Sequence, residues 1–343
     1  MARARRGRDP YPWATSTDED LLRTRLCDLG VDWRGTWLED CVEQLHTTLA
    51  RRGLRFRPHV WLSNEWFSPQ GVPGVAMPFY LAHPRLRRLE RTQMLEVEGG
   101  TRDGCLRVLK HECGHALQHA YRLHLRKRWR ELFGSTSKEY PEFYRPNPAS
   151  RRHVQHLRLY YAQSHPDEDF AETFAVWLGP RHRWRKRYAG WPALEKLEYL
   201  DTLLSEIADR PAPVRSRKHV DALRTQKQTL AEHYRDRRKR YPPETPDIYD
   251  RDLRQLFPDR SLDAERASAF LRRNRGEIRR LVSRWTGEYQ FTLEQVLDDM
   301  ISRCRTLDLR ATGDDDHLRM EFAVLLAVKT MHYHYSRRNW FAL

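Results

Sequence analysis

The chain has 343 residues, of which 39% are hydrophobic and 32% are charged, a composition sufficient for one large globular domain or two smaller ones. No stretch approaches the roughly 18 apolar residues of a membrane-spanning helix, which argues against an integral membrane protein. The net charge of +15 would attract acidic partners such as nucleic acid, anionic lipid or acidic peptides. We favour the simpler interpretation that this basic surface is only solvated.

The cysteines and the N-terminal residues indicate the compartment. The five cysteines show no Cys-x-x-Cys spacing and their number is odd, which fits a reducing environment. Residues 1–20 are rich in arginine and then polar, without the apolar segment of a signal peptide, and we expect them to be disordered. A cytoplasmic protein is therefore predicted.

Two helices and two strands are predicted ahead of the central motif. The helices cover residues 21–29 and 36–52, and each is followed by a glycine that can end it. The strands cover residues 56–62 and 74–81, where Val, Trp, Phe and Tyr lie between turn residues. Together these elements predict a small sheet packed against the next helix.

Residues 101–133 are predicted to form one long helix. Thr101 or Asp103 can cap its start, and Gly134 can end it. Gly114 lies inside this helix, where glycine costs about 1 kcal/mol relative to alanine. Its presence indicates that another element approaches this face closely.

This helix carries the sequence His111-Glu112-Cys113-Gly114-His115. Positions i and i+4 lie one turn apart on the same face of a helix, so His111 and His115 can present two imidazoles to one metal ion. A catalytic zinc takes three protein ligands and keeps one position for water. Glu112 projects beside the histidines, where it could accept the proton of that water.

Two further residues near the motif are not expected to bind the metal. Cys113 points away from the ligand face and is interpreted as a packed thiol. His119 could approach the same face, but a second helix already supplies a third ligand.

Residues 134–150 are rich in Pro, Ser and Tyr and are predicted to be a loop between two metal-bearing helices. We expect its aromatic residues, Tyr140, Phe143 and Tyr144, to pack onto the domain. The alternative is that they form one wall of the cleft and contact the substrate.

The second helix supplies two glutamates. Ser164 or His165 can cap its start, and residues 179–180 can end it. Glu168 and Glu172 are again spaced i and i+4. One of them can therefore bind the metal while the other accepts a hydrogen bond from the far nitrogen of a ligating histidine.

The rest of the chain is predicted to be helical. Residues 181–188 are a dense basic run with interleaved aromatics, which we interpret as a solvated turn in preference to a nucleic-acid contact. The Pro-rich residues 241–246 are the best candidate for a linker. Helices are predicted over residues 194–208, 219–240, 261–285, 291–309 and 315–337.

Residues 168–174, Glu-Asp-Phe-Ala-Glu-Thr-Phe, resemble the Glu-x-Phe-Ala-Glu-x-Phe pattern of lethal-factor-like peptidases. These are gluzincins, in which a helical His-Glu-x-x-His is completed by a glutamate on a later helix. The resemblance implies that Glu168 is the third ligand and that Glu172 supports a ligating histidine. It also implies that Tyr161, seven residues before the ligand glutamate, stabilises the transition state, with its neighbour Tyr160 as the rival candidate.

The resemblance extends over roughly residues 56–210. The stretches at 66–69, 78–84, 95–101 and 190–194 are similar to a bacterial family of zinc-binding metallopeptidases. Zinc peptidases of this class commonly bind substrate as an added strand at a sheet edge. Residues 74–78 are the candidate edge, because Pro78 would be awkward in a central strand. The alternative is a structural strand without substrate contact.

Taken with this resemblance, the sequence predicts an α+β, predominantly helical fold. Residues 21–240 would form a zincin-like domain with a small sheet packed on the His-Glu-x-x-His helix, and residues 241–343 a helical C-terminal region. The expected function is that of a metallopeptidase with one catalytic Zn²⁺, which hydrolyses a peptide or protein substrate through a zinc-bound water activated by Glu112.

Two other functions are compatible with the same residues. The first is a zinc-containing binding module whose basic surface recognises nucleic acid or a protein partner with little or no hydrolysis. Nucleic acid is not the favoured partner, and no membrane partner is expected. The second is a zinc hydrolase acting on a non-peptide amide. The sequence predicts neither the substrate identity nor the oligomeric state.

Overall fold

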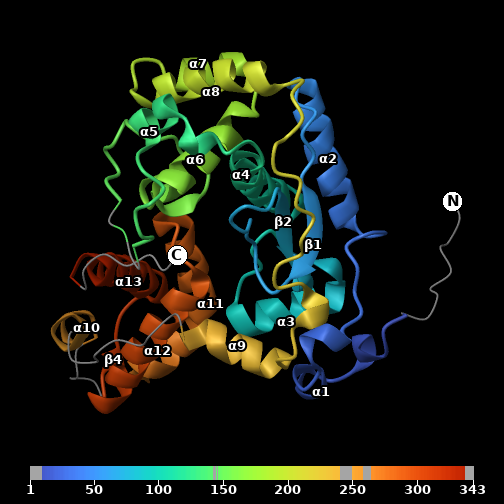
Figure 1. Cartoon of the computed structure of the whole chain (residues 1–343). Coiled ribbons are helices and arrows are strands. Elements are labelled where there is room, and N and C mark those ends of the chain that lie inside the picture. Colours follow the sequence, from blue (N-terminus) through green and yellow to red (C-terminus); the bar gives the residue numbers. More distant parts are fainter. Residues whose placement is uncertain (1–9, 142–143, 145, 240–248, 258–263, 337–343) are drawn as a thin grey trace, which may run out of the picture. The chain divides into compact units, whose positions relative to one another are not determined.

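The structure is a computed structural model that describes residues 10–141, 144, 146–239, 249–257 and 264–336 (Figure 1). The chain divides into two compact units. The first comprises residues 1–93, 97–141 and 146–235, and the second comprises residues 94–96, 142–145 and 236–343. The predicted linker at 241–246 lies outside the described residues, and a domain boundary near residue 240 stays a prediction.

Part of the N-terminal segment that was expected to be disordered is folded. Residues Pro12–Thr15 form the 3₁₀ helix η1, and α1 (Asp18–Leu22) follows, capped by Thr17. The indole of Trp13 is buried, and its Nε1 donates a hydrogen bond to the carbonyl of Leu29. The buried indole holds this segment on the first unit, and composition alone did not reveal that contact.

The sheet of the first unit consists of two parallel strands. The helix predicted over residues 36–52 is α2 (Trp37–Arg51), capped by Thr36, and it is followed by β1 (His59–Ser63) and β2 (Gly74–Pro78). Every residue of β2 is buried.

The expected open edge at residues 74–78 is contradicted at its centre. The amide of Ala76 donates a 2.8 Å hydrogen bond to the carbonyl of Phe67, which approaches β2 from an antiparallel direction. Because the chain itself pairs here, β2 does not offer a free edge to a substrate strand. The segment after Pro78 is the 3₁₀ helix Phe79–Ala82 and does not continue the strand.

The motif helix is shorter than predicted. α4 covers Arg102–Tyr121, and Arg122 adopts a left-handed conformation with φ 50°. A separate helix, α5 (Lys127–Phe133), follows and ends at Gly134. The amide of Val214 donates to the carbonyl of Ala120, so a distant segment satisfies a carbonyl at the end of α4.

Figure 1 shows α4 between the two-stranded sheet and α6 (Pro166–Trp177). Gly114 explains how closely these two helices approach. A Cβ atom at this position would lie 2.8 Å from the Cα of Ala171 and 3.2 Å from its carbonyl oxygen. Only glycine fits this contact, and the close approach predicted for this face is confirmed.

Two of the remaining helices of the first unit, α7 (Arg181–Arg187) and α8 (Ala193–Ile207), pack on α6. The basic run that was expected to be a turn is a short helix, α7, and α8 matches its predicted range closely. The helix predicted over 219–240 is wrong in its first half, where the chain is irregular apart from the 3₁₀ helix η6 (Leu223–Thr225). The observed helices are α3 (Pro84–Met94), α7 (Arg181–Arg187), α8 (Ala193–Ile207) and α9 (Leu230–Lys239), the last of which continues into the second unit.

The second unit is helical and has its own apolar core. The buried side chains Phe257, Phe270, Met300 and Phe322 belong to one cluster. A pair of two-residue strands, β3 (Glu265–Arg266) and β4 (Arg310–Ala311), is antiparallel. The described helices are α10 (Asp250–Leu256), α11 (Ala267–Thr286), α12 (Gln290–Thr306) and α13 (Asp315–Ser336).

The fold is therefore α+β and predominantly helical, as predicted. Among the described residues, every helix is too short or too polar to span a bilayer.

Candidate metal centre

The two histidines of the motif lie on one buried face of α4. The helix begins where the hydroxyl of Thr101 accepts a hydrogen bond from the amide of Gly104. His111 and His115 are 2% and 8% exposed, and their ring centroids lie 4.9 Å apart. The i, i+4 spacing thus brings both imidazoles to one point, as predicted.

The glutamate helix begins at His165, which is one of the two predicted caps. The Nε2 of His165 lies 3.0 Å from the carbonyl oxygen of Lys138, so this nitrogen carries the proton. Nδ1 is then free to accept a hydrogen bond from the amide of Asp167. The first turn of α6 contains Asp167, Glu168 and Asp169, and the positive end of the helix dipole stabilises their carboxylates.

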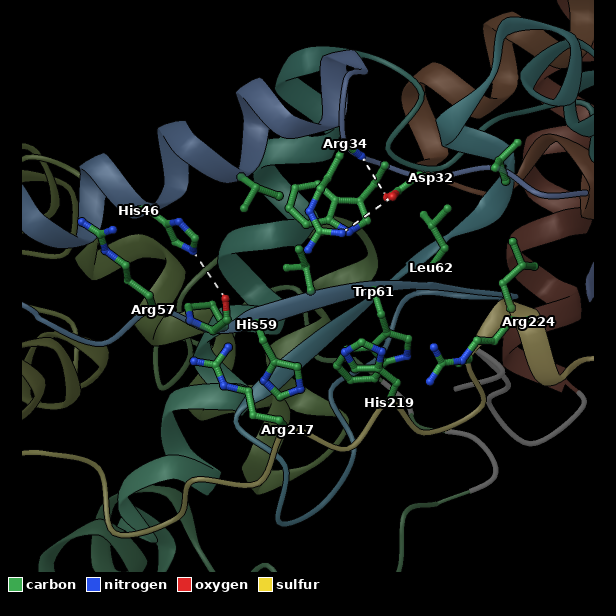
Figure 2. Close-up of a pocket in the computed structure, with 17 residues that line it drawn as sticks. Asp32, Arg34, His46, Arg57, His59, Trp61, Leu62, Arg217, His219 and Arg224 are labelled. Atoms are coloured by element: carbon green, nitrogen blue, oxygen red, sulfur yellow. Dashed lines mark hydrogen bonds and ion pairs between the residues drawn. The ribbon is translucent and has the colours of Figure 1, made fainter. Parts of the chain in front are cut away.

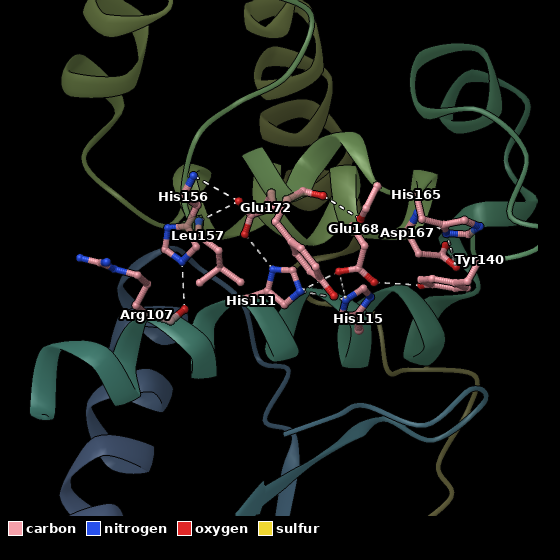
Figure 3. Close-up of polar contacts among 12 residues, drawn as sticks. Arg107, His111, His115, Tyr140, His156, Leu157, His165, Asp167, Glu168 and Glu172 are labelled. Carbon is pink, nitrogen blue, oxygen red and sulfur yellow. Dashed lines mark hydrogen bonds and ion pairs between the residues drawn. The ribbon is translucent and has the colours of Figure 1, made fainter. Parts of the chain in front are cut away.

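One oxygen of Glu168, on α6, lies close to both histidines of α4 (Figure 3). Its Oε2 lies 2.9 Å from Nε2 of His111 and 3.2 Å from Nε2 of His115, and the two nitrogens are 3.1 Å apart. All three side chains are buried. They form the cluster of possible metal ligands found among the described residues.

The three donor atoms fit one zinc ion. In a tetrahedral site with bonds of about 2.05 Å, neighbouring ligand atoms lie about 3.3 Å apart. The observed separations of 2.9, 3.1 and 3.2 Å need only a small expansion to reach this value. Two imidazoles and one carboxylate are also the donor set of many catalytic zinc sites, which keep a fourth position open.

Glu172 fixes the orientation of His111 from behind. Its Oε1 accepts a 2.9 Å hydrogen bond from Nδ1 of His111. Its Oε2 accepts hydrogen bonds from the amides of His156 and Leu157, at 3.2 and 2.8 Å. With a proton held on Nδ1 by Glu172, Nε2 is the nitrogen of His111 that can bind a metal ion.

These contacts determine the protonation of the cluster. Burial opposes the imidazolium form of His111, but its hydrogen bonds to Glu168 and Glu172 outweigh that effect and raise its pKa well above the usual value. Burial likewise opposes the charged form of Glu168, and the nearby His115 and His111 outweigh it and lower its pKa. Both shifts favour an ion pair between a protonated His111 and an ionised Glu168.

Glu112 is buried beside the two histidines. Burial raises its pKa, and the positive charges of His111 and His115 partly oppose this increase. A carboxyl group with a raised pKa is suited to take up and release a proton near neutral pH.

Tyr161 lies against the cluster on the short helix η5 (Arg158–Gln163). Its ring centroid is 5.5 Å from that of His111. The two preceding residues, Leu159 and Tyr160, both have left-handed backbones, with φ 60° and 57°. Consecutive left-handed residues without glycine are uncommon, so the structure holds Tyr161 here at the expense of local strain.

Tyr140 is a contact that the sequence did not reveal. Its hydroxyl donates a 2.9 Å hydrogen bond to Oε1 of Glu168, and its ring stacks on His165 with centroids 3.8 Å apart. Burial and the charges of Glu168 and Asp167 raise the pKa of Tyr140, so the phenol remains a donor. The sequence favoured a packing role for this loop tyrosine and gave no spacing signal toward the metal residues.

Three nearby titratable residues stay outside the cluster. Burial lowers the pKa of His119 to about 3, with the charges of His115 and His124 acting in the same direction. Cys113 is buried, and burial raises the pKa of its thiol. Asp169 points elsewhere and receives a 2.5 Å hydrogen bond from Nζ of the buried Lys196, which links α6 to α8.

Residues 79–184 match a family model described as "putative zinc-binding metallo-peptidase". This is the family that the sequence resembles, and the match confirms the resemblance over these residues. The matched segment contains α4 and α6 and all residues of the His111, His115 and Glu168 cluster. The chain matches no curated protein and no solved structure.

Proposed function

We propose that the protein is a zinc-dependent metallopeptidase with one catalytic zinc per chain, held by His111, His115 and Glu168. The observation that carries this proposal is the convergence of three buried donor atoms within 3.2 Å of one another. The family match supports the metal and the class of reaction. When bound, a zinc ion polarises a carbonyl and lowers the pKa of a water molecule to about 7.

Glu112 acts as the general base and then as the general acid. Its place beside His111 and His115, and the raised pKa that burial gives it, suit a carboxylate that removes a proton from the attacking water. The same carboxyl group then delivers that proton to the nitrogen of the leaving amine.

Two phenols serve the rest of the site. Tyr161 donates a hydrogen bond to the oxyanion that develops on the scissile carbonyl. Tyr140 holds the carboxylate of Glu168 through its hydroxyl and thereby fixes one oxygen while the other faces the histidines. A peptide or protein is the proposed substrate, and the five free thiols support the proposal of a cytoplasmic location.

The test separates metal binding from chemistry. Glu112→Gln should retain about one zinc per chain by elemental analysis and lose peptide hydrolysis by about 10²- to 10⁴-fold. Glu168→Ala should lose the metal itself. Glu43, exposed on α2, supplies matched controls, and Glu43→Gln and Glu43→Ala should leave both properties unchanged.

Two results would contradict the proposal. Full peptidase activity in Glu112→Gln would show that Glu112 is not the general base. The proposal of a metallopeptidase would also be wrong if wild-type protein purified without chelator failed to bind added zinc.

A further inference from the structure

A hollow lies in the first unit, apart from the metal cluster (Figure 2). It has a volume of about 540 Å³ and is lined by β1, by residues 31–34 ahead of α2, and by residues 217–224. None of its lining residues belongs to the metal cluster. The proposed peptidase chemistry therefore leaves this hollow unexplained.

Four arginines face the hollow, namely Arg34, Arg57, Arg217 and Arg224, and all four are exposed. One carboxylate, that of Asp32, lies among them, 3.7 Å from Arg34. Across the part of the chain that the structure describes, no carboxylate lies within 4.0 Å of Arg57, Arg217 or Arg224. An excess of three positive charges around one hollow creates a site for an anion.

The floor of the hollow is aromatic. Trp61 is 3% exposed, and its Nε1 donates a hydrogen bond to the carbonyl of Val220. The exposed ring of His219 lies parallel to the indole, at 8° and 5.2 Å between centroids, and His59 stacks on the same indole at 5.2 Å. A fixed indole thus supports a flat ring that is open to solvent.

The rings of the floor are neutral at physiological pH. Burial, followed by the charges of Arg224 and Arg34, lowers the pKa of His219, and burial lowers the pKa of His59. The hollow therefore combines neutral planar surfaces with separate guanidinium groups. Planar rings accept a base by stacking, and guanidinium groups bind phosphate.

A neighbouring hollow extends this surface. It has a volume of about 580 Å³ and shares Arg57, His59 and Arg217 with the first. It adds three arginines and one aspartate, and in this set Arg55 pairs with Asp209 at 3.0 Å. The additional lining cations are Arg55, Arg210 and Arg215. The basic lining therefore continues from the first hollow into the second.

From this arrangement we infer that the two hollows form one groove for single-stranded nucleic acid. A base stacks on His219, and the flanking phosphates bind Arg57, Arg217 and Arg224. An acidic peptide would make no use of the stacked rings. A free mononucleotide would leave the second hollow empty.

The test is to titrate a fluorescent single-stranded oligonucleotide with the full-length protein. Binding is measured by fluorescence anisotropy at several salt concentrations. Arg57→Ala/Arg217→Ala should weaken binding and reduce the slope of log K against log salt by about 1.4, since each phosphate contact contributes about 0.7. His219→Ala should weaken binding about tenfold. Arg88→Ala/Arg91→Ala is the matched control, because these exposed arginines lie on α3 outside both hollows. It should leave affinity and slope unchanged.

Three outcomes would overturn the inference. The first is no binding of the oligonucleotide at low salt. The second is an equal loss in Arg88→Ala/Arg91→Ala, which would indicate only diffuse attraction to the basic surface. The third is tighter binding of a mononucleotide or of inorganic tripolyphosphate than of the oligonucleotide, with no effect of His219→Ala. Because no variant touches the metal cluster, zinc content and peptidase activity report separately on the proposed function.

Discussion

Oε1 of Glu172 lies 2.9 Å from Nδ1 of His111, on the side of the imidazole opposite the nitrogen that faces Glu168. Glu172 is fully buried, and its second oxygen binds the amides of His156 and Leu157. One carboxylate thus joins the ring of a candidate ligand to the backbone of the chain ahead of η5. The orientation of His111 is set by this contact.

Replacing Glu172 with glutamine tests that contact. Glutamine keeps the size of the side chain but loses one of its two acceptor oxygens and the negative charge. We expect zinc affinity to fall about 10- to 100-fold while the protein remains folded. Competition with a chromophoric chelator measures the affinity, and circular dichroism checks the fold. Unchanged affinity would show that Glu172 does not orient the ligand.

The packing of α4 on α6 predicts that replacing Gly114 with alanine destabilises the protein. Gly114→Ala would bring a Cβ to 2.8 Å from the backbone of Ala171, so the helices must separate. We expect a loss of about 1–3 kcal/mol in unfolding free energy, together with weaker zinc binding.

Gly276 provides the control for that substitution. It also lies inside a helix, α11, but a Cβ there would meet only the flexible end of Arg280 at 3.4 Å. Gly276→Ala should stabilise the protein by about 0.5–1 kcal/mol. Urea unfolding measures both variants, and stabilisation by both would show that the α4–α6 contact tolerates a methyl group.

The role of Tyr161 can be separated from that of its neighbour. Tyr161→Phe should lower kcat about 10²- to 10³-fold with little change in KM or zinc content, because it removes a donor used in the transition state. Tyr160→Phe serves as the control and should have little effect, although both residues precede the glutamate helix. Equal losses in the two variants would point to a disturbed backbone, and the assignment of Tyr161 would then fail.

The lowered pKa of His119 predicts that the metal-free protein loses stability in acid. Its pKa is about 3 in the folded protein and about 6.5 when unfolded, so the unfolded chain takes up a proton first as the pH falls below 6.5. The metal-free protein should therefore lose about 2 kcal/mol between pH 8 and pH 5 through this group. The loss should be absent from His119→Gln, as measured by urea unfolding in chelator at both pH values. Equal pH dependence in the two proteins would contradict the assignment.

Local spacing predicted which side chains lie together around His111 and Glu168. The i, i+4 pairs, the caps at Thr101 and His165, and the glycine at the helix contact depend on residues within a few turns of one another. The family match supports the same interpretation. These features follow from helix geometry alone, so the sequence could reveal them.

Contacts between distant segments explain what the sequence missed. The end of α4 is set by Val214, which satisfies the carbonyl of Ala120, and Arg122 carries no glycine or proline signal. The first half of the helix predicted over residues 219–240 is absent because the side chains of Trp61 and Ser63 donate hydrogen bonds to the carbonyls of Val220 and Asp221. Hydrogen bonds from distant segments compete with those of a helix, and the sequence carries no periodic pattern that reveals them.

The spacing of the ligands along the chain has a consequence for folding. His115 and Glu168 are 53 residues apart, and an ion held by both closes the intervening chain into a ring. By the chain-entropy relation used for disulfides, a covalent closure of this length restricts the unfolded chain by about 4 kcal/mol. A chelator would then lower the melting temperature as well as the activity, and the loop that carries Tyr140 would be tethered at both ends by the cofactor.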